Sequence, residues 1–367
     1  MILKDIIKKF DKSNIKAGDG LEKGNYPLYT CSPIVNKYLD DYLYDDEAII
    51  ISTGGNFSAH YVNGKFNYST DCYVFNTDKY NLKYLYYYLL SKNEDINKMF
   101  RGAGLKHLNK NEFVMLNIKE IPLNEQNNIV NQLDKINEMI DVRKREIDKC
   151  NNLIKSQFVE MFGDFYYDDL WDTVNISKII IDKPSNGFFA KRDDYNSDGN
   201  ISVLGVSSVV NRMYSNIDNL PRTYATDKDI EKFKVKYGDL LFCRSSLVQE
   251  GIGKASIVPE IINETILFEC HVIRFILDLN KCVPEYIQMF TTTNYFRNQI
   301  LSGAKTSTMT TIGQSDILKC NIKLPPIQKQ LEFKNIVKQI DKQKFEFENS
   351  LKKLEELQAS LMQEYFG

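Results

Sequence analysis

The fold of this chain is decided by a stretch that reads IVNQLDKINEMIDVRKREIDKCNNLIKSQFVEM from Ile129 to Met161. Steps of four and three residues from Ile129 reach ten positions, and eight of these are apolar or cysteine. A period of 3.5 residues places such side chains along one narrow face of a helix, which is stable only when another helix covers it. We therefore predict a long helix over residues 122–163 and a partner for it.

The partner is a second stretch of the same chain, FKNIVKQIDKQKFEFENSLKKLEELQASLMQEY from Phe333 to Tyr365. It has the same stepping at a constant offset of 204 residues, and its flanks keep that offset: Pro122 matches Pro326, Gln126 matches Gln330, and Phe162 matches Phe366. A shared register of this length is an internal repeat. We predict a second long helix over residues 325–367.

The two apolar faces form a seam if the helices pair antiparallel as a coiled coil. In a flush register, facing positions have residue numbers that add up to 494. The other interpretation is that both are surface helices of one large domain, but their length, their polar outer faces and the repeat favour pairing. The predicted seam residues are Ile129, Leu133, Ile136, Ile140, Ile147, Ile154, Phe333, Val337, Ile340, Phe347, Leu351, Leu354 and Leu361.

The repeat divides the chain into segment, helix, segment, helix. The segments cover residues 1–121 and 164–324, and each shows short strand-like runs followed by a helix and a polar loop. Asn63-Gly64 has the composition of a tight hairpin turn. Gly102-Ala103 in the first segment matches Gly303-Ala304 in the second. The fold class is therefore α+β, with two domains of similar fold, each followed by a long helix.

Composition and motifs argue against catalysis by this chain. Asn-Pro-Pro-aromatic, Asp-Pro-Pro-aromatic and Walker motifs are missing from the sequence. Gly251-Ile252-Gly253-Lys254 lacks the spacing of a Walker motif and is interpreted as a turn. Three histidines and seven cysteines without a Cys-x-x-Cys pair predict no metal site. No apolar run reaches membrane-spanning length and no secretory leader is recognisable, so we expect a cytoplasmic protein that does not bind membranes.

Polar and basic loops occur at equivalent places in both segments. A net charge of −2 means that a surface for nucleic acid must be local. Arg and Lys suit phosphates and guanine edges, Asn suits adenine, and Ser and Thr suit either phosphate or base. The predicted DNA-binding residues are Lys65, Arg101, Lys106, His107, Asn109 and Lys110 in the first segment, and Lys191, Arg192, Arg244, Ser245, Ser246, Lys305, Thr306, Ser307 and Thr308 in the second.

The whole arrangement resembles the specificity (S) subunit of type I restriction–modification systems. The resemblance lies in IPLNEQNNIVNQLDKI and LPPIQKQLEFKNIVKQIDK at the two helix starts, in FVEMFGD after the first helix, and in the repeated Pro-x-x-x-Gln. It implies two target-recognition domains that each read half of a bipartite, asymmetric DNA target, spaced by an antiparallel coiled coil. It also implies a non-catalytic subunit that binds double-stranded DNA and two methyltransferase (M) subunits, with restriction (R) subunits left open.

The cofactors follow from the same resemblance. This chain is expected to bind none itself, because S-adenosylmethionine and ATP belong to the partner subunits. The alternative from another class is a coiled-coil scaffold without DNA recognition, and a self-contained methyltransferase or nuclease ranks third. A scaffold would not need two loop-rich α+β domains, and an enzyme would need catalytic residues that the sequence lacks.

Overall fold

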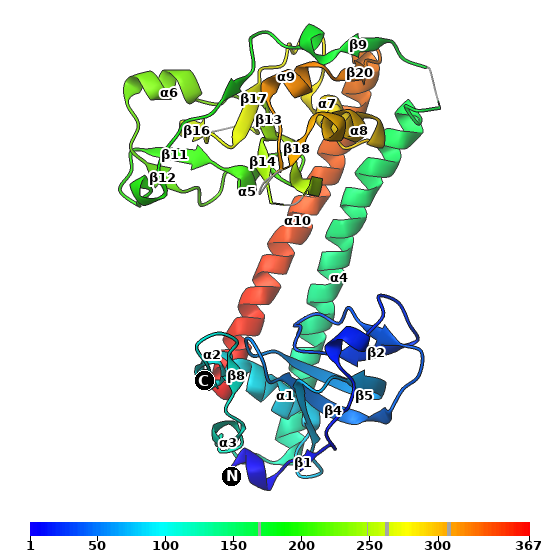
Figure 1. The fold of residues 1–367 in the computed structure, drawn as a ribbon, viewed down its shortest axis with the longest axis vertical. Helices are drawn as coiled ribbons and strands as arrows, with labels where there is room; N and C mark the ends of the chain where they lie inside the picture. Colours follow the sequence, from blue (N-terminus) through cyan, green and yellow to red (C-terminus); the bar gives the residue numbers. More distant parts are fainter. Residues whose placement is uncertain (168–169, 248, 261–263, 307–309) are drawn as a thin grey trace. The chain divides into compact units, whose positions relative to one another are not determined.

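The structure is a computed structural model that describes residues 1–167, 170–247, 249–260, 264–306 and 310–367. It divides into two compact units: unit 1 comprises Met1–Arg145 and Phe347–Gly367, and unit 2 comprises Glu146–Glu346. Both divisions fall inside the two long helices, α4 (Leu123–Phe162) and α10 (Ile327–Phe366), each of 40 residues (Figure 1). Each unit therefore contains one part of each long helix.

Unit 1 is built on a six-stranded sheet with strand order β1-β6-β4-β5-β2-β3. Neighbouring strands are antiparallel except β2 and β5, which run parallel. The strands are Lys8–Lys9 (β1), Tyr26–Tyr29 (β2), Tyr38–Leu39 (β3), Tyr44–Ser52 (β4), Ala59–Tyr68 (β5) and Cys72–Asn76 (β6). Two 3-10 turns precede or interrupt them, Leu3–Asp5 (η1) and Ala17–Asp19 (η2).

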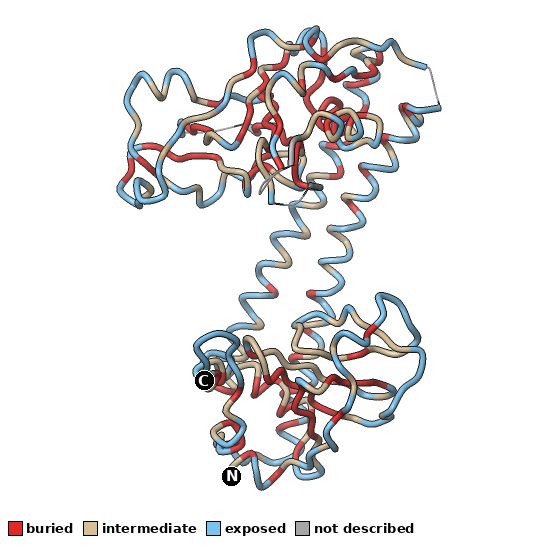
Figure 2. The backbone as a smooth tube through the Cα atoms, in the orientation of Figure 1, coloured by how far each residue is buried: buried red, intermediate tan, exposed pale blue. Residues whose placement is uncertain are grey.

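Both faces of this sheet are covered. Successive residues of a strand point to opposite faces, yet every residue of β4 from Ala48 to Ser52 is buried. Ile49 and Ile51 pack in the cluster that contains helix α1, whereas Ala48 and Ile50 pack in a second cluster on the opposite face. Figure 2 shows the buried residues gathered in the sheet region of each unit and recurring along the long helices.

The rest of unit 1 leads from the sheet to α4. The elements are the helices Leu82–Ser91 (α1) and Asn93–Lys98 (α2), the hairpin strands Phe100–Arg101 (β7) and His107–Leu108 (β8), and the helix Lys110–Phe113 (α3). The Asn81 side chain starts α1 by accepting a hydrogen bond from the Tyr84 backbone N–H.

The prediction of a turn at Asn63-Gly64 is wrong. Both residues lie inside the continuous strand β5, where they pair with Glu47 and Asp46 of β4. Gly64 has φ +121°, a backbone conformation that residues other than glycine rarely adopt. The register with β4 therefore outweighs the local turn preference, and the chain reverses at residues 53–58 instead.

The described part of unit 2 contains more and shorter strands. A four-stranded sheet has the order β10-β17-β13-β15, and three-stranded sheets have the orders β12-β11-β16 and β14-β19-β18. The strands of these sheets are Ser185–Asn186 (β10), Ile201–Leu204 (β11), Arg222–Thr223 (β12), Leu240–Cys243 (β13), Ser245–Ser246 (β14), Ala255–Ile257 (β15), Ile266–Phe268 (β16), Val272–Phe275 (β17), Lys305–Thr306 (β18) and Thr310–Thr311 (β19).

The remaining elements of unit 2 complete the sequence from α4 to α10. A two-stranded pair joins β9 (Thr173–Asn175) to β20 (Asn321–Lys323). The helices are Val206–Val209 (α5), Asp227–Phe233 (α6), Pro284–Thr291 (α7), Asn294–Gly303 (α8) and Gln314–Leu318 (α9), with 3-10 turns Ile176–Ile179 (η3), Arg192–Asp194 (η4) and Gln249–Gly251 (η5).

The two units share one order of elements before their long helices. In unit 1 it is α1, α2, the β7–β8 hairpin and α3; in unit 2 it is α7, α8, the β18–β19 hairpin and α9. Arg101 pairs with His107 in the first hairpin, and Lys305 pairs with Thr311 in the second, at the same offset of 204. The predicted match of Gly102 to Gly303 is therefore wrong, since Gly303 ends helix α8.

The long helices pair antiparallel, as predicted. In unit 1, Tyr365 donates a hydrogen bond to Gln132 (2.8 Å), Gln358 to Asn137, and Arg143 to Ser350 (3.1 Å). Residue numbers rise along α4 as they fall along α10, and the pairs add up to 497, 495 and 493, close to the predicted 494. In unit 2, Phe158 of α4 packs against Phe333 of α10. All thirteen predicted seam residues are buried or half-buried.

The repeated Gln makes the same two hydrogen bonds in each unit. Gln126 accepts from the backbone N–H of Asn81 (2.8 Å) and donates to the carbonyl of Ile121 (2.9 Å). Gln330 accepts from Val283 (2.9 Å) and donates to Pro325 (2.7 Å). Asn81 and Val283 are the residues that precede α1 and α7. The motif Pro-x-x-x-Gln thus fastens the start of each long helix to the start of another helix.

A second repeated contact uses the aromatic residues that end the long helices. Phe366, at the end of α10, packs against Tyr84 of α1 with ring centroids 5.3 Å apart. Phe162, at the end of α4, packs against Tyr286 of α7 at 4.8 Å. In each unit, one long helix begins beside the α+β segment and the other ends against it.

Candidate nucleic-acid interface

In unit 1, the loop after β4 lies beside the β7–β8 hairpin. Leu108 donates a backbone hydrogen bond to Thr53 (3.0 Å), and Gly55 donates to Lys106 (2.9 Å). Gly54 and His107 form an isolated bridge between them. The hairpin loop that carries the predicted Lys106 and His107 is therefore held against the end of a central strand rather than projecting alone.

A glycine is required where this hairpin turns. Gly102 has φ +148°, and a Cβ atom added there would lie 2.6 Å from the carbonyl oxygen of Leu105. Such a distance is shorter than real contacts allow, so the tight approach depends on the missing side chain. The turn leaves Lys106 and His107 exposed.

Arg101 and Asn109 have partners within the protein. The Arg101 guanidinium donates to Glu112 Oε2 at 2.8 Å, and the Asn109 amide donates to the same oxygen at 3.2 Å. Asn109 also accepts from the Glu112 backbone N–H and so caps helix α3. The ion pair is exposed, so Arg101 can exchange Glu112 for a phosphate at small cost, whereas Asn109 has a structural role.

Lys65 lies apart from this hairpin. It pairs with Asp45 across β4 and β5, at the opposite end of that pair from the loop at residues 53–58. Its ammonium sits 4.4 Å from the centre of the Tyr42 ring, and a hydrogen bond with Tyr42 raises the pKa of Lys65 above its usual value. Lys110 is exposed on α3, over the ring of Tyr73 at 5.6 Å.

Unit 2 repeats the arrangement with different residues. The chain leaving β13 continues as Arg244 and then as β14, which pairs with β19 of the hairpin. Ile312 donates a backbone hydrogen bond to Arg244 (3.1 Å), as Leu108 does to Thr53 in unit 1. The structure therefore brings Arg244, Ser245 and Ser246 together with the strands that hold Lys305 and Thr306.

Some predicted residues of unit 2 lie elsewhere or outside the described residues. Lys191 precedes η4 and Arg192 begins it, and both are exposed. The turn η4 contacts β12, where Thr223 donates to the carbonyl of Asp194 (3.0 Å). Ser307 and Thr308 fall in 307–309, outside the described residues. For Lys305 and Thr306 the structure describes the backbone.

Two residues of this site were not predicted. His271 Nδ1 lies 3.3 Å from Ser245 Oγ, and its carbonyl accepts from the Arg244 backbone N–H (2.9 Å). Thr311 pairs with Ser245 and Lys305 at once. His271 is in the turn between β16 and β17, so its approach to Ser245 depends on the pairing of β13 with β17. Thr311 could have been found, because it is the match of His107 at offset 204.

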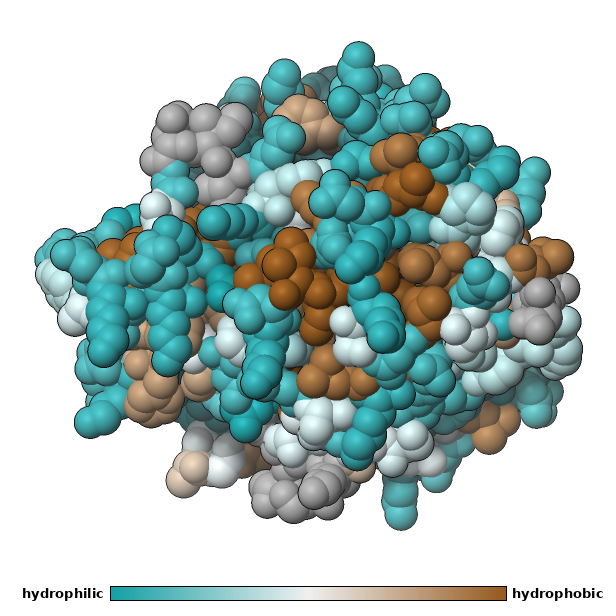
Figure 3. Space-filling view, turned by 90° about the horizontal axis from the view of Figure 1, so that it is seen from above, coloured by the Kyte–Doolittle hydropathy of each residue, from teal (hydrophilic) through white to brown (hydrophobic). Residues whose placement is uncertain are grey.

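The face of the molecule seen in Figure 3 is largely hydrophilic, with hydrophobic side chains gathered near its middle. Across the described ranges, no group of three or more His, Cys, Asp or Glu side chains could hold a metal ion. No helix among those described has the length and apolar character needed to cross a membrane.

The repeated strand-end and hairpin sites lie in segments that match a known family. A family model for the type I restriction modification DNA specificity domain matches residues 1–152 and 169–359. The chain belongs to this specificity-domain family. The match includes both α+β segments and most of both long helices.

Members of the specificity-domain family with curated names are distant in sequence. The EcoKI specificity subunit of Escherichia coli K12, a type I restriction enzyme subunit, is 23% identical over 289 residues, which cover 74% of this chain and 61% of that protein. The MjaVIII specificity subunit of Methanocaldococcus jannaschii is 23% identical over 295 residues, covering 74% of this chain and 68% of that protein. The chain thus aligns with about three-fifths of the E. coli relative's length.

Solved structures of the specificity-domain family share the fold. The S subunit of a type I restriction–modification system from M. genitalium superposes with a TM-score of 0.63 at 14% identity, over 99% of this chain and 94% of that one. A chain from a study of complex assembly and conformational transition of a type I system gives 0.52 at 14% identity, over 100% and 96%. The α+β fold of this chain is therefore shared with these two solved structures.

Proposed function

We propose that this chain is the DNA-specificity subunit of a type I restriction–modification system and reads a bipartite, asymmetric target. The observation that carries the proposal is the repeated site: a strand end held against a hairpin occurs in both units. The residues at matching positions differ, with Arg101 and His107 in unit 1 and Lys305 and Thr311 in unit 2. A shared framework with different side chains suits the reading of two different half-sites.

The partners follow from the proposed role. The chain would bind double-stranded DNA and two methyltransferase subunits, and restriction subunits where the system has them. S-adenosylmethionine and ATP would be bound by those partners, and this chain would take no part in catalysis. The complex would act in the cytoplasm. In support, the curated relatives are named as specificity subunits of type I restriction enzymes.

A scaffold without DNA recognition is less well supported. A scaffold requires the two long helices alone, but the family match extends over both α+β segments as well. The hairpin of unit 1 depends on Gly102, where an added Cβ atom would lie 2.6 Å from the carbonyl oxygen of Leu105. These features have a use at a DNA surface and none in helix pairing.

The test is methylome sequencing of cells that carry the chain with its own methyltransferase subunits. The parent should methylate an interrupted, non-palindromic target whose halves lie on the order of one helical turn (about 10 base pairs) apart. Lys106→Ala with His107→Ala should relax one half, and Lys305→Ala with Thr306→Ala should relax the other. A single uninterrupted target would overturn the proposal of two readers.

A matched control separates base reading from a general loss of binding. Lys23→Ala with Lys119→Ala removes two exposed positive charges of unit 1 outside the hairpin and should leave both half-sites unchanged. If the hairpin variants reduce methylation equally over both halves, their residues contact the DNA backbone rather than the bases.

A further inference from the structure

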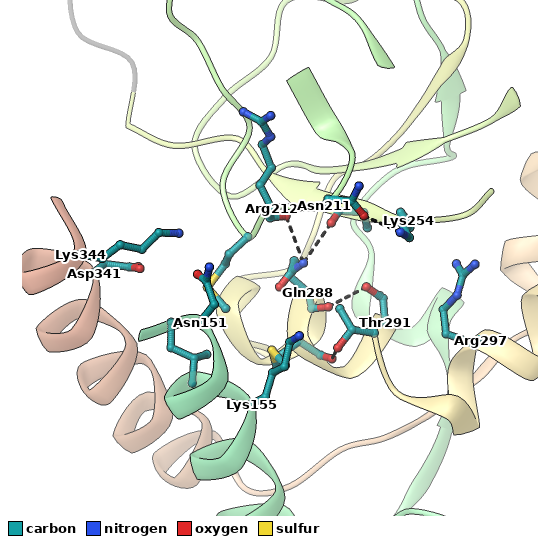
Figure 4. Close-up of a pocket in the computed structure, with 15 residues that line it drawn as sticks. Asn151, Lys155, Asn211, Arg212, Lys254, Gln288, Thr291, Arg297, Asp341 and Lys344 are labelled. Carbon is teal, nitrogen blue, oxygen red and sulfur yellow. Dashed lines mark hydrogen bonds between the residues drawn. The ribbon is translucent and has the colours of Figure 1, made fainter. Parts of the chain in front are cut away.

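A cavity of about 400 Å³ in unit 2 lies outside the predicted DNA-binding residues. Among the described residues that line it, the charged ones are five cations and one carboxylate. They are Lys155 on α4, Arg212 after α5, Lys254 before β15, Arg297 on α8, and Lys344 and Asp341 on α10. Figure 4 shows these side chains arranged around Gln288 of α7.

The fixed partners of two of these cations are neutral. Arg297 donates to the backbone carbonyls of Ile252 (2.6 Å) and Glu250 (3.3 Å). Lys254 donates to the side-chain oxygen of Asn211. These contacts orient the positive charges without neutralising them. Burial lowers the pKa of Arg297, which is the effect expected of a guanidinium withdrawn from water.

The cavity adjoins the strand that ends at the candidate DNA interface. The backbone N–H of Cys243, the last residue of β13, donates to the carbonyl of Lys254 at 2.8 Å, and Gly253 donates back to Cys243 at 2.9 Å. Arg244 follows Cys243 directly. Since paired strands lie about 4.8 Å apart, the backbone of Lys254 is one strand spacing from the start of that interface.

We propose that this cavity binds a phosphate group, and that the phosphate belongs to the DNA backbone beside the half-site that unit 2 reads. This inference rests on the proposed function. Lys and Arg side chains are the usual phosphate ligands in DNA complexes, and such contacts fix the position of the protein without distinguishing bases. The cavity thus supplies affinity and register, while Arg244, Ser245 and the β18–β19 hairpin supply selectivity.

The experiment uses the full chain in complex with its methyltransferase subunits. Binding to a duplex carrying the methylated target, and to a scrambled duplex, is measured from 50 to 200 mM KCl. The test variant is Lys155→Gln with Arg212→Gln, because both residues are exposed. Loss of the one phosphate contact lowers the steepness of log K against log salt by about 0.9, so the affinity lost over this fourfold rise in salt should shrink by roughly 3.5-fold.

Two control variants are matched to the test. Lys155→Arg with Arg212→Lys keeps both charges and should keep the parental slope. Lys178→Gln with Lys183→Gln removes two exposed charges of unit 2 that do not line the cavity, and should also keep it. The test variant should weaken target and scrambled duplex alike and leave the sequence of the methylated target unchanged.

A second arm distinguishes the sources of phosphate. Thermal stabilisation of the parent and the test variant by inorganic phosphate and by AMP is compared. An unchanged salt slope together with stabilisation of the parent alone would keep a phosphate site but overturn the DNA source. The inference is overturned if the test variant keeps the parental salt slope and neither phosphate nor AMP stabilises the parent. If the parent complex binds target and scrambled duplex equally, the proposed function fails, while the ligand arm still tests the cavity.

Discussion

At the scale of single residues, Gln126 and Gln330 explain why Pro-x-x-x-Gln occurs at both helix starts. Each amide uses its oxygen on one backbone N–H and its nitrogen on one carbonyl. Both side chains are buried, at 2% and 0% exposure, so the backbone groups that they bind cannot form hydrogen bonds with water instead. A buried backbone group left without a partner costs about 1–3 kcal/mol.

Replacing Gln330 with alanine should therefore destabilise unit 2. The change leaves the N–H of Val283 and the carbonyl of Pro325 without their hydrogen bonds to Gln330. We expect the free energy of unfolding to fall by about 2–4 kcal/mol. For a unit of this size the melting temperature should fall by roughly 5–10 °C. Calorimetry would measure it, with Gln343→Ala, an exposed position of the same helix, as the control. Equal melting of the two variants would contradict this role.

Asp239 should make the stability of unit 2 depend on pH. Burial raises its pKa to about 6, although it accepts from the Lys236 N–H and lies 3.9 Å from Arg274. The folded state therefore holds the proton more tightly than the unfolded state, whose pKa is about 3.9. Stability conferred by this group is present below about pH 4 and is lost as the pH rises to about 6, by on the order of 2–3 kcal/mol.

Urea unfolding of the parent and of Asp239→Asn between pH 4 and pH 7 measures this dependence. The asparagine keeps an oxygen for the Lys236 N–H but carries no charge, so the difference in unfolding free energy should change in favour of the variant as the pH rises. Asp193→Asn removes an exposed carboxylate and is the control. A difference that stays constant with pH would contradict the assignment.

At the scale of elements, the paired long helices depend on their apolar seam. Leu351 packs with Ile136, Ile140 and Leu354 in unit 1. Leu351→Asp would place a charge among these side chains without a partner and should cost several kcal/mol, about 3–5. Ala359→Asp introduces the same group at an exposed position and is the control. Thermal unfolding measures the effect, and parental behaviour of Leu351→Asp would contradict it.

Elements that a local sequence pattern specifies could be predicted, whereas elements that depend on pairing with distant strands could not. The long helices were predictable because a heptad pattern records helix contact in the sequence itself. The turn at Asn63-Gly64 was wrongly predicted because β4 imposes a longer register on both residues. The neighbouring strands β16 and β17 belong to different sheets, and no local signal in the sequence records that division.

At the scale of the whole molecule, the two candidate interfaces belong to different compact units, 1 and 2. Changes that share no contacts usually add in free energy to within about 0.5 kcal/mol. The loss of target binding caused by Lys106→Ala and that caused by Arg244→Ala should therefore sum in the combined variant. Fluorescence anisotropy with the target duplex measures all three. A combined loss well above or below the sum would mean that the units are energetically coupled.

The candidate site was only partly visible in the sequence. The two loops were found from their Gly-Ala pairs at an offset of 201, whereas the structure aligns the hairpins at 204; Arg101, Lys106, His107, Lys305 and Thr306 lie in or beside these hairpins. Lys65, Lys191 and Arg192 were chosen for their chemistry, and the structure places them in other parts of their units. Their separation from the hairpins follows from strand pairing, which sequence periodicity does not give.

The buried glutamine contacts also bear on inheritance. Each α+β segment meets the long helices through a few positions that recur at one offset, among them Gln126 and Gln330, and Phe162 and Phe366. A recombination event that replaced the segment between two such positions would bring its own matching contacts. Under the proposed function, a lineage could acquire a new DNA target in one genetic exchange, while the seam between the helices passed unchanged to its descendants.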